Sequence, residues 1–342
     1  MNILMVGPDP KEKGGIATVI SNFKQYYTSE KHQLFFLSSW SEKSKWKTEW
    51  QAFRLIRKVI HNQKIDVVHF HVAQKGSFYR KALLSRLVPK HCRVIFHMHA
   101  SQFDLFYEKS RWIMKALIRH VFNRIDHVVV LGENWKKFYQ TVTTTEVSII
   151  QNAVQIPESS SYDAKSKTIV TFGRIGKRKG SYDLLQVAAR MDKDFPEVKF
   201  VLYGDGDIEG VSDEIKMMGL QNVELGGWVS KEEQAEILKT TMLHFLPSYR
   251  EGLPMAVLET MASGIPNLTT NVGDIPAVIS DGKNGMLVCP GEVEVMANEL
   301  ACFIKDDNGI QNRYSKNARQ TIEQNFSFEA YMRSWEQIYK KT

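Results

Sequence analysis

The stretch that decides the fold is Pro247-Ser248-Tyr249-Arg250-Glu251-Gly252-Leu253-Pro254-Met255-Ala256-Val257-Leu258-Glu259. It holds two glutamates, Glu251 and Glu259, with seven residues between them. Pro254 suits the first turn of a helix, where a missing N–H has no cost, and Gly264 is a suitable end. Nearly every other side chain of this predicted helix is apolar, which is typical of a buried helix. The sequence therefore predicts one carboxylate inside a buried helix and another at its N-terminal end.

A buried carboxylate needs a partner, because its desolvation is otherwise costly. An ion pair or a hydrogen bond to backbone is the simplest interpretation. The N-terminus of the helix adds unpaired N–H groups and the positive end of a dipole, which favour an anion. Carboxylates that accept sugar or ribose hydroxyls beside a phosphate-binding helix end would fit this arrangement.

The segment from Glu251 to Glu259 resembles the E-x7-E motif of the retaining glycosyltransferases of the GT-B fold, in particular the large family 4. The flanking residues match that family's pattern of a Glu, a Gly, a short apolar run with a Pro, then Leu-Glu and Met-Ala. Other segments match in order along essentially the whole chain. The resemblance implies an α/β protein with two Rossmann-like, doubly wound parallel-sheet domains that face a cleft.

Composition agrees with a two-domain protein of the cytoplasm. The chain has 342 residues, 43% of them hydrophobic, enough for two cores. Its three cysteines, Cys92, Cys289 and Cys302, lack metal or disulfide spacing, which fits a reducing compartment. The N-terminal apolar run is too short for a signal peptide, and no run approaches the roughly 18 apolar residues of a membrane span. We expect a cytoplasmic protein, soluble or peripheral on the inner face of the cell membrane.

Charge is distributed unevenly along the chain. Residues 1–157 hold 24 Lys and Arg against 11 Asp and Glu, a net +13, and the remainder holds 21 against 27, a net −6. A basic half could meet nucleic acid, anionic lipid or a phosphorylated acceptor. No nucleic-acid-binding motif is present. The resemblance implies a nucleotide-sugar donor and a glycan or lipid-linked acceptor as partners, and the basic half makes an anionic membrane surface a further expected partner.

The first half alternates between short apolar runs and helical patterns. Strands are predicted at residues 2–6, 33–37, 66–71, 93–98 and 126–131, with helices at 46–62, 76–88 and 106–124. This alternation indicates a parallel sheet covered on both faces. The pair Gly14-Gly15 opens a further helix, where backbone N–H groups can approach a phosphate. An ordinary loop is an equal alternative, but the pair also resembles the Gly-Gly loop that contacts the donor diphosphate in GT-B enzymes.

Four histidines, His69, His71, His97 and His99, lie at the ends of two predicted strands. A metal cluster is conceivable, but two sequential strands need not place them together, and no nearby Cys or Asp completes a site. We predict no metal. His99 stands at the carboxyl end of a parallel strand, where α/β proteins bind ligands. The family carries a His here beside the donor sugar, although Ala100 replaces the commoner Gly.

Residues 147–154 resemble the I-P-N-G-V segment of the family, with Asn152 at the entry to the hinge. The Ser-rich stretch 157–163 is the best linker candidate. We therefore predict an N-terminal acceptor domain of residues 1–157 and a nucleotide-sugar donor domain of residues 158–326. By resemblance, the C-terminal helix 327–342 crosses back to complete the first domain.

Residues 173–180, GRIGKRKG, match the family's G-R-x4-K-G. A solvated basic loop is the usual fate of such a run, but its place between a strand and a helix favours phosphate binding. The resemblance makes Arg174 and Lys179 the pair that grips the donor diphosphate, since fixed cations stabilise a leaving group that gains negative charge. Lys177 and Arg178 are expected to face solvent.

The resemblance also implies further roles. Glu251 would hold donor-sugar hydroxyls and support positive charge, Glu259 would hold the ribose, and the amide of Gly15 would contact the diphosphate. The backbone of the remaining site residues would contact the sugar or the base, at Gly252, Leu253, Pro254 and Val229. We read Asp205-Gly206-Asp207 as a tight turn rather than a metal motif. The predicted reaction is front-face transfer with retention, without metal or cofactor.

Three other functions were weighed. A nucleotide-sugar 2-epimerase shares the fold but lacks the pairing of Arg-x4-Lys-Gly with E-x7-E. A non-catalytic nucleotide-sugar-binding module is opposed by the presence of Glu251, Arg174 and Lys179. A dehydrogenase would need a dinucleotide fingerprint that the Gly14 region does not provide.

The predicted helix 106–124 is amphipathic. Arg111, Lys115 and Arg119 recur every four residues on one face, and Trp112 lies near the border of an apolar face. A basic face with Trp and Leu is typical of an interfacial helix, although packing of the apolar face on the sheet is the simpler expectation. Our hypothesis is reversible docking of the N-terminal domain on anionic membranes.

Overall fold

The computed structural model describes residues 1–306 and 309–340. The chain divides into two compact units. Unit 1 is Met1–Asn152 together with the chain from Tyr331 onward, and unit 2 is Ala153–Ala330. The observed division thus falls five residues before the predicted boundary at 157/158, and the return to unit 1 begins at Tyr331 rather than at residue 327.

Unit 1 contains a six-stranded, fully parallel sheet in the order β2-β1-β3-β4-β5-β6. The strands are β1 (Asn2–Pro8), β2 (Gln33–Trp40), β3 (Val67–Val72), β4 (Arg93–Met98), β5 (His127–Val130) and β6 (Val147–Ile149). The helices are α1 (Gly15–Tyr26), α2 (Lys45–Asn62), α3 (Gly76–Ser85), α4 (Phe103–Glu108), α5 (Trp112–Phe122), α6 (Glu133–Val142) and α13 (Phe328–Lys340), most of which lies in unit 1.

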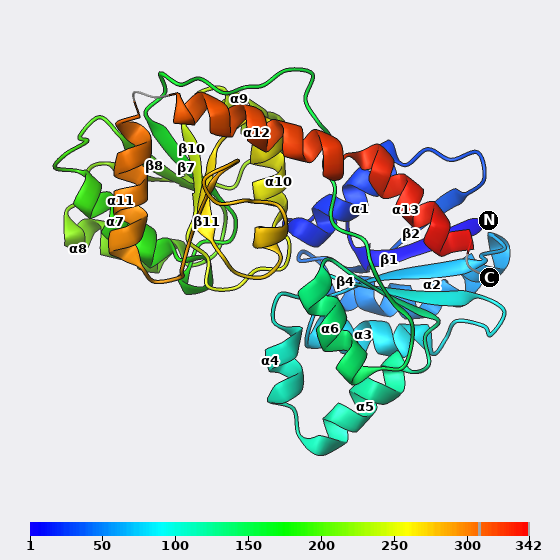
Figure 1. Ribbon diagram of the computed structural model, residues 1–342. Helices are drawn as coiled ribbons and strands as arrows, with labels where there is room; N and C mark the ends of the chain where they lie inside the picture. Colours follow the sequence, from blue (N-terminus) through cyan, green and yellow to red (C-terminus); the bar gives the residue numbers. More distant parts are fainter. Residues whose placement is uncertain (307–308, 341–342) are drawn as a thin grey trace. The chain divides into compact units, whose positions relative to one another are not determined.

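Alternate residues of β3 face opposite layers of unit 1. Phe70 packs in the core with residues of α2, α3, α5 and α6. His69 on the other face meets Phe23 of α1 and Trp335 of α13. Figure 1 shows the same layering, with α1 and α13 on one side of this sheet and α2, α3 and α6 on the other.

Unit 2 contains a second six-stranded parallel sheet, in the order β12-β11-β10-β7-β8-β9. Its strands are β7 (Thr168–Phe172), β8 (Lys199–Tyr203), β9 (Val223–Gly227), β10 (Leu243–Leu246), β11 (Asn267–Thr270) and β12 (Met286–Val288). Its helices are α7 (Ser181–Met191), α8 (Ile208–Met218), α9 (Lys231–Leu238), α10 (Met255–Ala262), α11 (Val293–Ile304) and α12 (Ile310–Asn325), with 3-10 turns η1 (Lys177–Lys179) and η2 (Ile275–Ala277).

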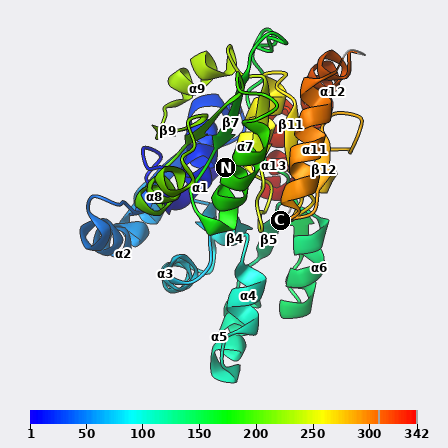
Figure 2. The ribbon, with the colours of Figure 1, turned by 90° about the vertical axis from the view of Figure 1, so that its left-hand side faces the viewer.

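Helices also cover both faces of the second sheet. Ile169 of β7 lies in a core with residues of α7, α8 and α11, and α7 packs against α11 (Figure 2). Val170, the next residue, packs on the other face with Leu238 and Ile265. Leu238 is the last residue of α9, and Ile265 lies just after α10. The expected α/β class with two doubly wound parallel sheets is confirmed.

In each sheet, the order in which successive strands are added reverses at one point. In unit 1, β1 lies between β2 and β3, and in unit 2, β7 lies between β10 and β8. Ligands of open α/β sheets bind beyond the carboxyl ends of the strands at such a switch point. The loops that matter are therefore those after β1 and β3 in unit 1, and after β7 and β10 in unit 2.

The predicted helix 106–124 is wrong in its extent. The structure has two helices, α4 and α5, separated at residues 109–111, where Arg111 has extended backbone angles. Ser110 caps the break, because its hydroxyl donates to the carbonyl of Phe106 at 2.7 Å. Of the apolar residues in this stretch, α5 buries Ile118, Val121 and Phe122 and exposes Trp112, Ile113 and Leu117. No described helix is long and apolar enough to cross a bilayer.

Candidate functional site

The loop after β7 and the loop after β10 touch in unit 2. Gly180, at the start of α7, has φ +70°, and a Cβ there would lie 1.9 Å from the carbonyl oxygen of Pro247. Only glycine allows this approach, since no other residue tolerates both the angle and the contact. Tyr249 strengthens the junction, because its N–H donates to the carbonyl of Arg178 at 2.9 Å. The two motifs found in the sequence are thus brought together by the backbone.

Glu251 is held at this junction by opposite charge. Its side chain is 6% exposed, and Oε1 lies 2.6 Å from Nζ of Lys179. The buried Ser248 hydroxyl donates to the same oxygen at 2.6 Å. Hydrogen bonds of this charge-assisted kind are short and strong. The structure therefore joins two residues that the sequence analysis had assigned to different parts of the ligand.

Arg178 was expected to face solvent, and that expectation is wrong. Its Nη1 donates to the carbonyl of Arg250 at 2.9 Å and lies 3.8 Å from Oε2 of Glu251. The physical reason is the 3-10 turn η1, which directs Arg178 and Lys179 towards the β10 loop while Lys177 stays exposed. Arg174, by contrast, is 69% exposed and pairs with Asp205 at 3.7 Å.

His244 on β10 is a site residue that the sequence analysis missed. It is buried, its Nδ1 lies 2.6 Å from Oδ1 of Asn267, and its Nε2 accepts from the N–H of Phe172 at 3.4 Å. Burial and, to a smaller extent, the positive charge of Lys179 lower its pKa to about 4, against the opposing effects of the Asn267 hydrogen bond and of Glu251. A neutral imidazole thus lies behind the ion pair. Its position inside a strand gave no motif by which to find it.

Glu259 lies on α10, apart from the ion pair, and is less buried than predicted. Most of α10 is buried, but Glu259 stays partly exposed, and the amide of Gln234 lies 3.4 Å from its Oε2. Desolvation raises its pKa, and Lys231 and Gln234 offset this in part.

Pro254 is the N-cap of α10 rather than a residue of its first turn. The helix therefore begins one residue later than predicted.

The backbone after Glu251 is tightly enclosed. Gly252, Leu253 and Pro254 are buried, and the carbonyl of Gly252 accepts from the N–H of Asp274 at 2.9 Å. Val229 lies elsewhere in unit 2, partly buried against the cluster that contains Leu238.

The Asp205-Gly206-Asp207 turn is used structurally, as predicted. Asp207 caps α8 by accepting from the N–H of Gly210 at 3.3 Å and also accepts from the hydroxyl of Tyr182 at 2.7 Å. Asp205 faces Arg174.

In unit 1, Gly14 and Gly15 open α1 at the switch point of the first sheet. Gly14 has φ +109° as the N-cap, and both glycines are exposed. A Cβ at Gly14 would meet no other described atom within 4 Å. Asn152, the last residue of unit 1, is buried.

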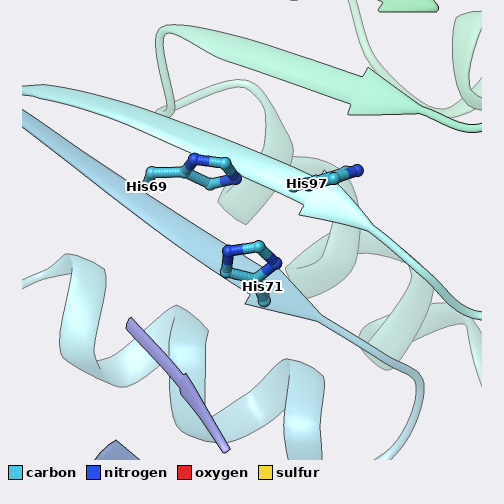
Figure 3. Close-up of side chains that lie close together, drawn as sticks. All are labelled: His69, His71 and His97. Carbon is cyan, nitrogen blue, oxygen red and sulfur yellow. The ribbon is translucent and has the colours of Figure 1, made fainter. Parts of the chain in front are cut away.

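The histidines of β3 and β4 lie together, an arrangement that the sequence had left open. The two strands are neighbours, with His71 opposite His97, and each of His69, His71 and His97 is buried (Figure 3). One potential ligand nitrogen from each lies within 4.8 Å of the others. The ring of His69 stacks between that of His71, 4.4 Å away at 15°, and that of Trp335, 4.3 Å away at 28°.

This stacking argues against a preformed metal site. Imidazole nitrogens bind Zn²⁺ in the plane of the ring at about 2.0–2.1 Å. The nearly parallel rings of His69 and His71 direct their lone pairs side by side rather than to one point, and the ring of His97 is tilted by 40° and 46° to them. Burial lowers the pKa of His69, His71 and His97 well below the usual value, and the neighbouring histidines lower it further. The group is best described as a neutral aromatic stack beneath α13.

His99 ends the stack at the carboxyl edge. It is partly exposed, and its Nε2 lies 3.0 Å from Nδ1 of His71. Burial lowers the pKa of His99 to about 3, with a further contribution from the positive charge of Lys81. At neutral pH this side chain is a neutral hydrogen-bonding group at the edge where ligands bind.

Two family models match the chain in succession. Residues 13–156 match "Glycosyltransferase Family 4" and residues 154–321 match "Glycosyl transferases group 1". Together these matches extend from α1 to α12 and include both sets of loops described above.

The chain is a family 4 glycosyltransferase.

Relatives support this assignment over most of the chain. A protein of the cps region of Klebsiella pneumoniae is 24% identical over 99% of both chains. A UDP-Gal:alpha-D-GlcNAc-diphosphoundecaprenol alpha-1,3-galactosyltransferase of Escherichia coli is 24% identical, covering 79% of this chain and 74% of its own. The N-acetyl-alpha-D-glucosaminyl L-malate synthase of Bacillus anthracis is 23% identical, covering 82% and 76%.

Solved structures show that the GT-B fold is shared. The sucrose-phosphate synthase of Thermosynechococcus elongatus superposes with a TM-score of 0.82 at 14% identity, covering 99% of this chain and 98% of its own. The Anabaena protein HepE, solved in complex with UDP-glucose, gives a TM-score of 0.77 at 17% identity over 100% of both chains. The GT-B prediction for this glycosyltransferase is confirmed.

Proposed function

We propose that this glycosyltransferase moves a sugar from a UDP- or GDP-sugar to a glycan or lipid-linked acceptor, with retention at the anomeric carbon, in the assembly of a surface polysaccharide. The observation that carries the proposal is the ion pair between Glu251 and Lys179 at the switch point of unit 2. The names of its relatives support the wider class, since they include a cps-region protein and a transferase that acts on a diphosphoundecaprenol acceptor.

The proposed donor site is in unit 2. Lys179 has three N–H donors, so it can hold Glu251 with one and a diphosphate oxygen with another. Arg174, which is 69% exposed, is accessible to the same ligand. These cations would stabilise the charge that develops on the leaving diphosphate. Glu251, fixed by Ser248 and Lys179, would accept hydroxyls of the donor sugar, and Glu259 would accept those of the ribose.

The proposed reaction needs no protein nucleophile. The acceptor oxygen bonds to the anomeric carbon on the face that the diphosphate leaves, the carbon–oxygen bond to the diphosphate breaks, and the acceptor proton passes to a phosphate oxygen. Unit 1 would bind the acceptor, with His99 as a neutral hydrogen-bonding group and the amide of Gly15 contacting phosphate.

The fixed cations also support a reaction independent of metal. Incubation with EDTA followed by removal of the chelator should leave turnover within about twofold of its starting value, since Lys179 and Arg174 supply the positive charge. Loss of activity in EDTA that magnesium or manganese restores would contradict this part of the proposal.

A thermal-shift screen of UDP- and GDP-sugars tests the donor proposal. A ligand that binds the folded state raises the midpoint in proportion to ln(1 + [L]/Kd). The best donor should then be incubated with and without acceptor candidates, and the anomeric configuration of the product read by NMR. Transfer with retention supports the proposal. An epimerised sugar formed without acceptor would indicate an isomerase, and binding without slow donor hydrolysis would indicate a non-catalytic module.

Membrane docking is the second part of the proposal. Unit 1 carries the basic excess, and α5 exposes Trp112 by 75% and Ile113 by 55%. On α2, Trp46 is 86% and Trp50 59% exposed. Tryptophan beside basic residues suits the interface of an anionic bilayer. The basic face of α5 is partly engaged, because Arg119 donates to the Tyr107 hydroxyl at 2.8 Å.

The docking test therefore replaces apolar residues rather than charges. The variant Trp112→Ser with Ile113→Ser should lose sedimentation with phosphatidylglycerol vesicles at low salt. Met217→Ser, which removes a residue 74% exposed on α8 of unit 2, is the matched control. Equal sedimentation of all three proteins, or no sedimentation of the wild type, would contradict membrane docking.

A further inference from the structure

Lys81 on α3 is a buried lysine that none of the roles above uses. Its side chain is 2% exposed, and its Nζ donates to Oγ of Ser77, one turn earlier, at 3.0 Å. The same Oγ accepts from the N–H of Ala73 at 3.1 Å. A buried ammonium normally has a carboxylate partner, because desolvation is otherwise costly. Lys81 forms no salt bridge within residues 1–306 and 309–340.

Glu49, whose negative charge acts on Lys81, is already engaged with another residue. Glu49 on α2 lies 3.5 Å from Nη1 of Arg80, the neighbour of Lys81. Burial and the positive charge of Arg80 lower the pKa of Lys81 to about 7, and the charge of Glu49 offsets this only in part. The protein therefore keeps a lysine in the interior whose charge its own side chains leave uncompensated.

Lys81 lies beside the ligand-binding edge of unit 1. Helix α3 begins directly after the carboxyl end of β3, a strand of the switch point. The first-turn N–H groups of Gly76, Ser77 and Phe78 have no hydrogen-bond acceptor among the described residues, and no side chain caps this end. Three unpaired N–H groups and the positive end of the helix dipole attract an anion.

The donor set indicates the kind of anion. The ammonium of Lys81 has N–H donors to spare, the hydroxyl of Ser77 has its proton free to donate, and the first turn of α3 adds backbone N–H groups. A helix N-terminus, a hydroxyl and a lysine together offer several donors, which suit a phosphoryl group with three terminal oxygens better than a planar carboxylate. The neighbouring β4 ends at His99, so a bound acceptor would lie within the same edge of the sheet.

We propose that Lys81, Ser77 and the first turn of α3 form a phosphoryl-binding site that recognises a phosphate or diphosphate group of the acceptor. This rests on the proposed function in one respect, that unit 1 binds the acceptor. A bound phosphoryl group supplies the negative charge that Lys81 lacks. The phosphoryl group could belong to a lipid-linked diphosphate or to a soluble phosphorylated acceptor.

Calorimetric titration of the full chain with inorganic pyrophosphate tests the site. The background is Arg174→Ala with Lys179→Ala, which removes the proposed diphosphate cations of unit 2. We expect pyrophosphate to bind this background and Lys81→Met to weaken that binding about 10- to 100-fold, the scale for a hydrogen bond to a charged group. Lys90→Met, which removes an exposed lysine of unit 1, should change it less than about twofold.

A second variant guards against misfolding. If Lys81→Met lowers the unfolding midpoint markedly, Ser77→Ala should still weaken pyrophosphate binding, by roughly fivefold for one neutral hydrogen bond. Equal affinities in Lys81→Met, Ser77→Ala and Lys90→Met would overturn the site, as would absence of pyrophosphate binding to the background.

Geranyl diphosphate separates the two sources of the phosphoryl group. Tighter binding than inorganic pyrophosphate, still dependent on Lys81, indicates a lipid-linked acceptor, and equal or weaker binding with the same dependence indicates a soluble one. Failure here is distinct from failure of the donor proposal. Stabilisation of the wild type by nucleotide sugars without Lys81-dependent pyrophosphate binding overturns only the phosphoryl site, and the opposite pattern overturns only the donor assignment.

Discussion

The two units place different chemistry at the same point of the same fold. At the switch point of unit 2, Lys179 and Glu251 neutralise each other at 2.6 Å. At the carboxyl edge of unit 1, Lys81 donates to the neutral Ser77 and has no salt-bridge partner among the described residues, and His99 is held neutral. The difference shows that one sheet topology fixes where a ligand binds, while the residues of its loops decide which charges the ligand must supply.

The largest expected effect comes from removing either partner of the ion pair in unit 2. Lys179→Ala and Glu251→Gln should each lower turnover by about 10²- to 10³-fold, the usual scale for one preorganised charge stabiliser. Lys177→Ala, an exposed residue of the same 3-10 turn, is the matched control and should leave turnover within about twofold. Steady-state rates with the best donor of the screen provide the measurement. A similar loss in all three variants would remove the special role of the pair.

Glu259→Gln should act on the nucleotide instead. We expect weaker nucleoside diphosphate binding with a smaller effect on turnover, because the ribose lies away from the reacting carbon. Calorimetric titration with the nucleoside diphosphate measures this. Identical kinetic and binding changes in Glu251→Gln and Glu259→Gln would contradict the division of roles.

The uncompensated charge of Lys81 in unit 1 predicts that stability depends on pH. Burial lowers the pKa of Lys81 from 10.5 to about 7, so between these values the unfolded chain binds a proton that the folded chain does not. The free energy of unfolding should therefore rise with pH above 7, by up to about 1.4 kcal/mol per pH unit. Denaturant unfolding at pH 7, 8 and 9 should show this rise reduced in Lys81→Met and intact in Lys90→Met. Parallel profiles for the wild type and Lys81→Met would contradict it.

The histidine stack predicts a loss of stability at the acid end. Neither ring nitrogen of His97 has a hydrogen-bond partner among the described residues, and its pKa lies well below 6.5. The unfolded chain therefore binds the extra proton below pH 6.5, and stability falls as pH decreases, by up to about 1.4 kcal/mol per unit for this residue. His97→Leu should weaken this acid dependence, whereas His120→Leu, at an exposed site on α5, should not. The same slope in both variants would contradict the stack as its source.

The smallest expected effect on turnover concerns Arg178, which lies between Lys177 and Lys179 in the same 3-10 turn. Its guanidinium is 35% exposed and lies 3.8 Å from Glu251, so it supports the pair more weakly than Lys179 does. Arg178→Ala should lower turnover by roughly fivefold to tenfold, corresponding to about 1 kcal/mol. A loss as large as that of Lys179→Ala would assign Arg178 a direct contact with the donor.

Much of the fold was predictable because local pattern and tertiary structure agree. The predicted strand 93–98 matches β4, since buried parallel strands are continuous apolar runs. The short strands β6, β11 and β12 were not predicted, because three or four residues such as Asn267–Thr270 carry no periodic signal. The break between α4 and α5 depends on the hydroxyl of Ser110, which a helical pattern does not reveal.

The site was predictable where a motif carried it. Glu251 and Lys179 were found from motifs that resemble those of the family, but their contact depends on which loops the strand order makes adjacent. His244 and Lys81 could not be found, because a polar residue within an apolar element looks like an exposed one until the structure buries it. Arg178 was wrongly predicted to face solvent, because neighbouring residues of a 3-10 turn point in different directions and the sequence does not show which of Lys177 and Arg178 is exposed.

A structure of the full chain with the nucleotide sugar that stabilises it most would show whether Lys179 and Glu251 bind the donor. We expect a diphosphate oxygen within about 2.7–3.2 Å of Nζ of Lys179 and sugar hydroxyls at the same distance from the carboxylate of Glu251. A diphosphate bound away from Lys179, or a sugar that leaves Glu251 without a ligand contact, would contradict it.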